Sequence, residues 1–176
     1  MTDSDEELAV RAQKGEAAAF RLLLERHYVL IYRVAYRLLG SAADAEDVAQ
    51  EVCSGLPSKI AGFRGRSRFS TWLYTVTLNV ARDHGRRQRT IAKLQGTYMS
   101  LAEHQAADWA DTDSKLRWLY LALDRLDRGL KETALLILAE ELSHREAGEV
   151  LGIKESTVSW RMHEVKKKLK AMAQHD

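Results

Sequence analysis

The spacing of the apolar residues limits this chain to a helical fold. Apolar side chains recur every three or four positions over residues 16–39 and again over residues 158–169, which is the period of an amphipathic helix. The chain contains one proline, and alternating runs of β-branched residues are scarce. Both observations argue against a β-sheet. We therefore predict an all-α fold.

Capping residues and glycines divide the N-terminal half into helices. Ser4 and Glu7 have the spacing of a capping box, and Gly15 should end the short helix that they open. Gly40 should end the long helix over residues 16–39, because glycine readily adopts the left-handed conformation that closes a helix. Ser41 is then placed to open the next helix.

Two further boundaries are expected in this half. Gly55 and Pro57 should bend or stop the third helix, because proline lacks the backbone donor that a helix needs. Ser70 is placed to cap a long helix that runs to about Leu94. Between these boundaries, residues 64–68 form a loop of arginine, glycine and serine.

The C-terminal half has the pattern of a helix-turn-helix. Residues 95–113 lack a clear period and predict a linker, and two apolar helical stretches follow up to residue 142. Ser143 and Glu146 then make a second capping box, Gly152 provides a turn, and Ala147 is small enough for two helices to cross closely. The last helix carries basic and polar residues outward, which favours DNA binding over an ordinary helical hairpin.

The net charge of +2 conceals a strong segregation of charge along the chain. Residues 59–94 hold nine basic residues and one acidic residue, a net charge of +8. Residues 1–52 and residues 95–142 each have a net charge of −4. A basic block of this density indicates a surface for an anionic partner, and the acidic blocks indicate either solvated helix faces or separate partner surfaces.

Residues 62–89 combine this positive charge with aromatic side chains. The loop of residues 64–68 leads into Phe69, Trp72 and Tyr74, and an arginine cluster follows. Aromatic rings stack on bases and arginines bind phosphates, so this segment predicts contact with nucleic acid whose bases are partly unstacked. Trp72 and Tyr74 lie two positions apart and face different ways on a helix, and we expect Trp72 to be largely in the core.

Three motifs, in this order, resemble the extracytoplasmic-function (ECF) RNA polymerase sigma factors of the sigma-70 family. They are SAADAEDVAQEV (residues 41–52), FRGRSRFSTWLYTVTLNVARDHGRR (residues 63–87) and LSHREAGEVLGIKESTVSWRMHEVKKKL (residues 142–169). The resemblance covers about residues 8–94 and 114–172. It implies a sigma-2-like domain over residues 1–94, a flexible linker over residues 95–113, and a sigma-4-like helix-turn-helix domain over residues 114–176.

The resemblance also implies partners. They are core RNA polymerase, through the β′ coiled coil and the β flap, promoter DNA, and an anti-sigma factor that holds the protein inactive. No cofactor and no membrane insertion are implied. The first ten residues are acidic and form no visible signal peptide, and no apolar run is long enough to span a bilayer, so we expect a cytoplasmic protein.

The same resemblance assigns site residues. Those expected to dock on core polymerase are Asp44, Glu46, Asp47, Val48, Gln50 and Glu51. Those expected to bind the −10 element are Arg64, Arg66, Ser67, Arg68, Phe69, Tyr74, Asn79, Arg82, Asp83, Arg86 and Arg87. Those expected to bind the −35 element are Lys154, Glu155, Ser156, Thr157, Ser159, Trp160, Arg161, His163 and Lys166.

Two other functions remain open at this point. A stand-alone helix-turn-helix regulator with an N-terminal helical sensor domain explains the C-terminal pattern, but not the basic aromatic block. An enzyme fits poorly, because the six histidines form no metal-spaced pair and no catalytic or metal-binding motif is present. The single cysteine, Cys53, excludes an internal disulfide; it could sense redox state, although a lone cysteine on an apolar face usually only fills space.

Overall fold

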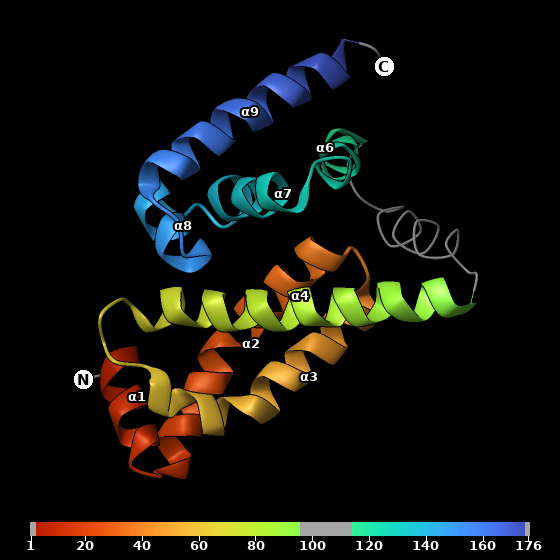
Figure 1. Cartoon of the computed structure of the whole chain (residues 1–176). Helices are drawn as coiled ribbons and strands as arrows, with labels where there is room; N and C mark the ends of the chain where they lie inside the picture. Colours follow the sequence, from red (N-terminus) through yellow and green to blue (C-terminus); the bar gives the residue numbers. More distant parts are fainter. Residues whose placement is uncertain (1–2, 96–113, 175–176) are drawn as a thin grey trace. The chain divides into compact units, whose positions relative to one another are not determined.

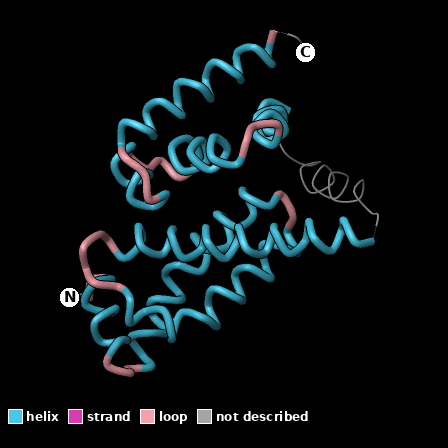
Figure 2. The backbone as a smooth tube through the Cα atoms, in the orientation of Figure 1, coloured by secondary structure: helices cyan, strands magenta, loops and turns pink. Residues whose placement is uncertain are grey.

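The computed structural model of the chain describes residues 3–95 and 114–174. It divides the chain into two compact units, Met1–Gln105 and Ala106–Asp176. All regular elements within the described ranges are helical, as Figure 2 shows, so the prediction of an all-α fold is confirmed. The predicted linker of residues 95–113 lies, apart from Gln95, outside the described residues. No helix in the described part of the chain is both long and apolar enough to cross a membrane.

Within residues 3–95, the first unit contains four α-helices and a short 3₁₀ turn (Figure 1). In chain order they are α1 (Asp5–Gln13), α2 (Ala17–Leu39), α3 (Ala42–Lys59), η1 (Ile60–Gly62) and α4 (Phe69–Gln95). The predicted capping box is present at the start of α1, where the Ser4 side chain accepts from the Glu7 backbone and the Glu7 side chain accepts from Ser4. Gly40 ends α2 with a φ of 69°, as its sequence position predicts.

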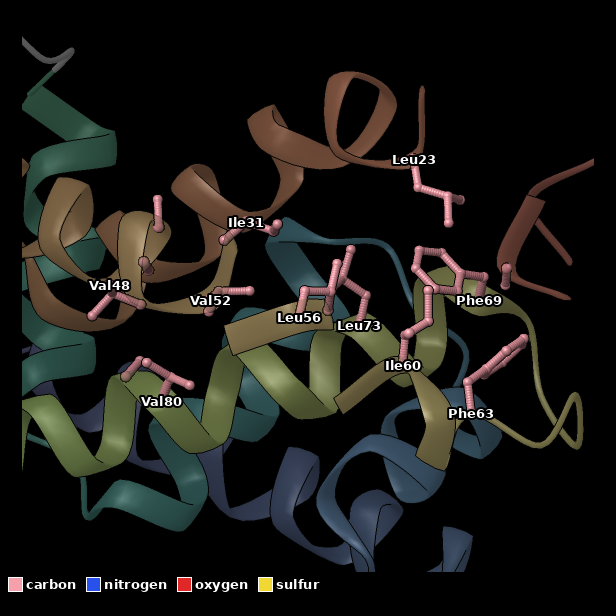
Figure 3. Close-up of a cluster of buried hydrophobic side chains, with 14 of the residues drawn as sticks. Leu23, Ile31, Val48, Val52, Leu56, Ile60, Phe63, Phe69, Leu73 and Val80 are labelled. Carbon is pink, nitrogen blue, oxygen red and sulfur yellow. The ribbon is translucent and has the colours of Figure 1, made fainter. Parts of the chain in front are cut away.

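Helices α2, α3 and α4 share one apolar core, which α1 extends with Leu8 and Ala9. Figure 3 shows Leu56 of α3 beside Leu73 of α4, with Ile31 of α2 close by. These three side chains are at most 1% exposed. Burying an aliphatic side chain of this size stabilises a fold by about 1.5–3 kcal/mol, so the contact among the three helices contributes several kcal/mol to the stability of this unit.

Two helix boundaries in this unit differ from those that the sequence predicts, although whether Gly55 and Pro57 bend α3 stays a prediction. Helix α3 does not stop at Gly55 and Pro57 but continues to Lys59, because Leu56 and Ile60, one helical turn apart, are both buried in the core. Helix α4 begins at Phe69, one residue before the expected cap Ser70. The free backbone N–H of Phe69 donates instead to Glu6 Oε1 of α1, at 3.1 Å.

The second unit contains α6 (Ser114–Asp124), α7 (Arg128–Ala134), a π-helical turn η2 (Leu135–Ala139), α8 (His144–Leu151) and α9 (Glu155–Ala173). The second of the two apolar helical stretches predicted before residue 142 is thus α7 with η2, and Asp127 caps it by accepting from the Leu130 backbone N–H. The second capping box, Ser143 with Glu146, opens α8 as predicted. Gly152 then closes α8 with a φ of 68°.

Helices α8 and α9 form the predicted helix-turn-helix. Val158, Met162 and Val165 of α9 are buried and give the helix its apolar face. Ala147 is fully buried, and the next residue, Gly148, approaches the turn so closely that a Cβ there would lie 2.8 Å from the Ile153 carbonyl oxygen. This turn leaves the opposite face of α9 open to solvent.

Candidate nucleic-acid interface

The N-terminal half of α3 presents an acidic and polar face. Ser41 caps the helix by accepting from the Asp44 backbone N–H. Glu46, Asp47, Gln50 and Glu51 are exposed, so four of the residues predicted to dock on the polymerase are available to a partner. Val48 is not, because it is fully buried against α2 and α4; its assignment as a contact residue is corrected to one of core packing.

Two side-chain pairs tie this acidic face to α4. His84 of α4 is 9% exposed at its side chain, and its Nε2 lies 2.7 Å from Asp44 Oδ1. Three residues further along α4, Arg87 donates to Glu51 Oε2 at 2.6 Å. Asp44 therefore holds the two helices together from a half-buried position, whereas the Glu51–Arg87 pair lies on the surface.

Asp44, Asp47 and His84 also place their ligand atoms within 4.8 Å of one another. Such a group could in principle hold a metal ion. The hydrogen bond between His84 and Asp44 already accounts for two of its members, and the spread of the atoms is wide for a site with metal–ligand bonds of about 2.0–2.2 Å. We interpret the group as an interhelical polar contact.

The loop of residues 64–68 lies between η1 and α4. Arg64, Arg66 and Arg68 are exposed, Ser67 is half-buried, and Gly65 adopts a positive φ of 64°. Three arginines within five residues make this loop a dense positive surface at the start of α4. This positive surface is formed by the same loop that the sequence predicts to contact unpaired bases and phosphates.

The aromatic residues around this loop pack with one another instead of facing solvent. Phe69, predicted to bind DNA, is fully buried; its ring meets Phe63 edge to face at 5.4 Å and packs against His27 at a tilt, at 5.3 Å between ring centroids. Trp72 is half-buried and packs against Phe63 and Phe69 at 5.6 Å, as expected for a residue that belongs largely to the core. Tyr74 is only 5% exposed. The assignments of Phe69 and Tyr74 as open DNA contacts are therefore corrected.

One face of α4 carries the remaining residues predicted for the −10 element. Asn79 is exposed, and its side-chain oxygen accepts from Arg82 Nη1 at 3.2 Å, which orients the amide. Asp83 and Arg86 are exposed and form an ion pair at 2.8 Å. These side chains and the paired Arg87 give α4 a polar, largely basic surface that follows the loop.

The outer face of α9 carries the residues predicted for the −35 element. Most of them are exposed, and Trp160 has 61% of its surface open to solvent. Arg161 differs, because it is half-buried and its Nη1 lies 3.4 Å from both the Gly129 carbonyl and Thr133 Oγ1 of α7. It packs toward α7 and is not part of the open face. The exposed set is Lys154, Glu155, Ser156, Ser159, Trp160, His163 and Lys166, with Thr157 half-buried.

Sequence reasoning missed several residues that support these surfaces. His144 of α8 contacts Ser159 of α9 through Nδ1 and Oγ at 2.8 Å, and Glu6 and Gln13 of α1 contact the two ends of the loop of residues 64–68. No local pattern marks these residues, since each partner is distant in the sequence. Gly148 could have been found, because it follows Ala147 inside a predicted helix where glycine is otherwise unfavourable.

Cys53 lies half-buried on α3. Burial raises the pKa of its thiol, which lowers the fraction of reactive thiolate at neutral pH. This environment agrees with a cysteine that fills space.

Comparison with known proteins assigns both units to one family. The family model of sigma-70 region 2 matches residues 23–91, and the model of sigma-70 region 4 matches residues 116–169. The ECF RNA polymerase sigma factor SigW of Bacillus subtilis is 29% identical over 164 residues, which cover 87% of this chain and 88% of SigW. The ECF RNA polymerase sigma factor SigE of Mycolicibacterium smegmatis is 33% identical over 152 residues, which cover 84% of this chain and 59% of SigE.

Solved structures agree with this assignment. The chain resembles CnrH, solved in complex with the cytosolic domain of CnrY, with a TM-score of 0.73, 28% identity and 99% of each chain covered. It shares its fold with the sigma factor RpoE of Bartonella quintana, solved with the anti-sigma factor NepR, at a TM-score of 0.70, 21% identity and coverage of 89% of this chain and 98% of that one. The chain therefore belongs to the ECF group of the sigma-70 family of RNA polymerase sigma factors.

Proposed function

We propose that the exposed acidic face of α3 docks this sigma factor on core RNA polymerase, that the loop of residues 64–68 and α4 bind the −10 element, and that α9 binds the −35 element. Within this assignment, residues 1–94 act as the polymerase-binding and −10 domain, residues 95–113 as the linker, and residues 114–176 as the −35 domain. The protein acts in the cytoplasm and catalyses no reaction itself.

The observation that carries the −10 assignment is the placement of three exposed arginines directly before a helix that exposes Asn79. Extruding a base from a duplex costs a few kcal/mol, which base contacts and phosphate contacts must offset. An asparagine amide can make two hydrogen bonds to a base edge, and the arginines of the loop can bind the neighbouring phosphates. Loop and helix together supply both kinds of contact.

Reconstituted transcription tests this proposal. Purified protein with core polymerase should initiate from a subset of a promoter library, and the protein alone should bind duplex DNA weakly. Substituting Asn79→Ala should reduce initiation from the preferred −10 sequence by about 5–150-fold, the range that corresponds to one bidentate base contact, and core binding should be retained. Unchanged promoter selection by this variant would contradict the role of Asn79.

We further propose control by an anti-sigma factor that covers the polymerase-binding surfaces of both domains. The support is the complex in which the similar protein CnrH was solved with the cytosolic domain of CnrY. A partner of this kind would hold the two domains in a form that cannot bind polymerase. Solution scattering and limited proteolysis of residues 95–113, with and without the partner, test the idea. Identical scattering profiles and cleavage rates in the two states would argue against it.

A further inference from the structure

Helix α1 contacts both ends of the loop that we assign to −10 binding. Gln13 Nε2, at the end of α1, donates to the Ile60 carbonyl at 2.8 Å and to the Phe63 carbonyl at 2.7 Å. Glu6 Oε1, at the start of α1, accepts from the Phe69 backbone N–H at 3.1 Å. The five loop residues 64–68 lie between these contacts, so both ends of the loop are bonded to the same short helix.

The chemistry of the groups determines which atom donates and which accepts in each of these contacts. Two carbonyl oxygens converge on one Gln13 nitrogen, and only an amide NH₂ among the groups of glutamine can donate to both. Phe69 is the first residue of α4, where backbone N–H groups have no partner within the helix. A carboxylate bound there is favoured by the positive end of the helix dipole. Glu6 therefore caps α4 from a different helix.

The loop between these contacts lies largely on the surface. Arg64, Gly65, Arg66 and Arg68 are all exposed. Below them the rings of Phe63 and Phe69 meet edge to face with centroids 5.4 Å apart, which closes the base of the loop. Polar contacts to α1 thus fix the residues on both sides of the exposed arginines.

Helix α1 is itself held firmly enough to serve as a support. Leu8 and Ala9 are at most 1% exposed in the core. Asp5 contacts Arg26 at 2.8 Å and His27 at 2.7 Å on α2. The ring of His27 in turn packs on Phe69. A rigid connection thus runs from α2 through α1 to both ends of the loop.

We propose that Glu6 and Gln13 are positioning residues for −10 recognition, with α1 serving as the clamp that presents the loop of residues 64–68 to DNA. This inference rests on the proposed −10 function of the loop and adds residues that do not themselves contact DNA. Their effect is exerted through the geometry of the loop. Losing the clamp should relax base selection and leave the docking face of α3 unchanged.

Near-isosteric substitutions in the full-length protein test the clamp. Gln13→Glu keeps the size of the side chain but turns two donors into acceptors that face two carbonyls. Glu6→Ala removes the cap of Phe69, whereas Glu6→Gln keeps an acceptor oxygen and should restore most of the function. Gln174→Glu, an exposed change of the same chemistry on the other unit, controls for the added charge.

Hydrogen exchange and transcription are measured on each variant. Each lost hydrogen bond corresponds to a factor of roughly five, so Gln13→Glu should raise amide exchange over residues 60–69 by about tenfold or more. Exchange in α2 and α3 and the affinity for core polymerase should not change. In a competition among promoters with single −10 changes, Gln13→Glu and Glu6→Ala should flatten the preference, and Glu6→Gln and Gln174→Glu should retain it.

An Arg64→Ala, Arg66→Ala double variant separates the two proposals. If it alters −10 preference while Gln13→Glu alters neither loop exchange nor preference, the clamp is refuted and the −10 assignment stands. If the double variant also leaves the −10 preference intact, the assignment of the loop to −10 binding is refuted, and the proposed role of the clamp is refuted with it. An equal loss of core affinity and of transcription from all promoters would show a purely structural role and would also refute the clamp.

Discussion

The close approach of Gly148 to the turn of the helix-turn-helix predicts the effect of adding a single methyl group. A Cβ at Gly148 would lie 2.8 Å from the Ile153 carbonyl oxygen, closer than these atoms can pack. That carbonyl belongs to the backbone of a tight turn, in which the Ile153 N–H donates to the Gly148 carbonyl at 3.0 Å. Neither atom can move without displacing the start of α9, so Gly148→Ala should destabilise this unit.

Two opposing free-energy terms determine how much Gly148→Ala destabilises this unit. Overpacking of a close contact costs about 1–3 kcal/mol, and alanine in place of glycine inside a helix contributes about 1 kcal/mol of stability. Because the clash is with a backbone atom, we take an overpacking cost of about 2–3 kcal/mol. The net destabilisation is then about 1–2 kcal/mol, which multiplies the unfolded fraction by roughly 5–30. At Gly55 of α3, by contrast, an added Cβ would meet only the flexible end of Lys59, at 3.5 Å. Gly55→Ala should therefore stabilise its unit by about 1 kcal/mol.

Hydrogen exchange on the full-length protein distinguishes these outcomes, because it reports each unit separately. Protection of the α8 and α9 amides should fall by about 5–30-fold in Gly148→Ala, with α2, α3 and α4 unaffected. Gly55→Ala should leave α8 and α9 unchanged and slow the exchange in α3. Unchanged or increased protection of α9 in Gly148→Ala would show that the turn yields to the methyl group at no cost, and the packing argument would be refuted.

Three further predictions follow from single buried or half-buried groups. The hydroxyl of Thr77 is buried with no hydrogen-bond partner among the described residues, so Thr77→Val should raise the free energy of unfolding by about 1 kcal/mol in urea titrations, and a decrease would reveal a hidden partner. Burial favours a higher pKa for Asp5, but hydrogen bonds and charges from Arg26 and His27 outweigh it and lower that pKa below its ordinary value of 3.8. The stability that Asp5 contributes should thus be complete above about pH 4 and be lost as the pH falls through the lowered pKa, so Asp5→Asn should destabilise at pH 7 more than at pH 2, and equal losses would contradict the linkage. Because burial raises the pKa of the Cys53 thiol, iodoacetamide should modify Cys53 several-fold more slowly in the folded protein than in urea, and equal rates would contradict this.

The parts of the fold that the sequence predicts correctly depend on neighbours in the chain. Ser4 and Ser143 form capping boxes, and Gly40 and Gly152 close helices, because each of these motifs is complete within a few residues. The end of α3 was predicted wrongly for the opposite reason. Pro57 disfavours helix locally, but burial of Leu56 against other helices outweighs that preference.

The candidate site was predicted less completely, because motif positions do not say which face of a helix a residue occupies. Val48 and Phe69 lie within the right segments but point into the core, and Arg161 lies on the right helix but packs toward α7. The support from Glu6 and Gln13 could not be predicted at all. Their bonds join residues 47 to 63 positions apart, and no local sequence pattern marks such pairs.

These sequence separations also determine the order in which the contacts of α1 can form during synthesis. Helix α1 leaves the ribosome before α4, and the Phe69 N–H that donates to Glu6 is made 63 residues after Glu6. At about 5–20 residues per second, that interval lasts roughly 3–12 s. The carbonyl partners of Gln13 are made earlier in this interval, at Ile60 and Phe63, so the arginine loop emerges with only its first end able to bond to α1. A nascent chain halted before Phe69 would therefore carry the acidic face of α3 without an arginine loop that is bonded at both ends.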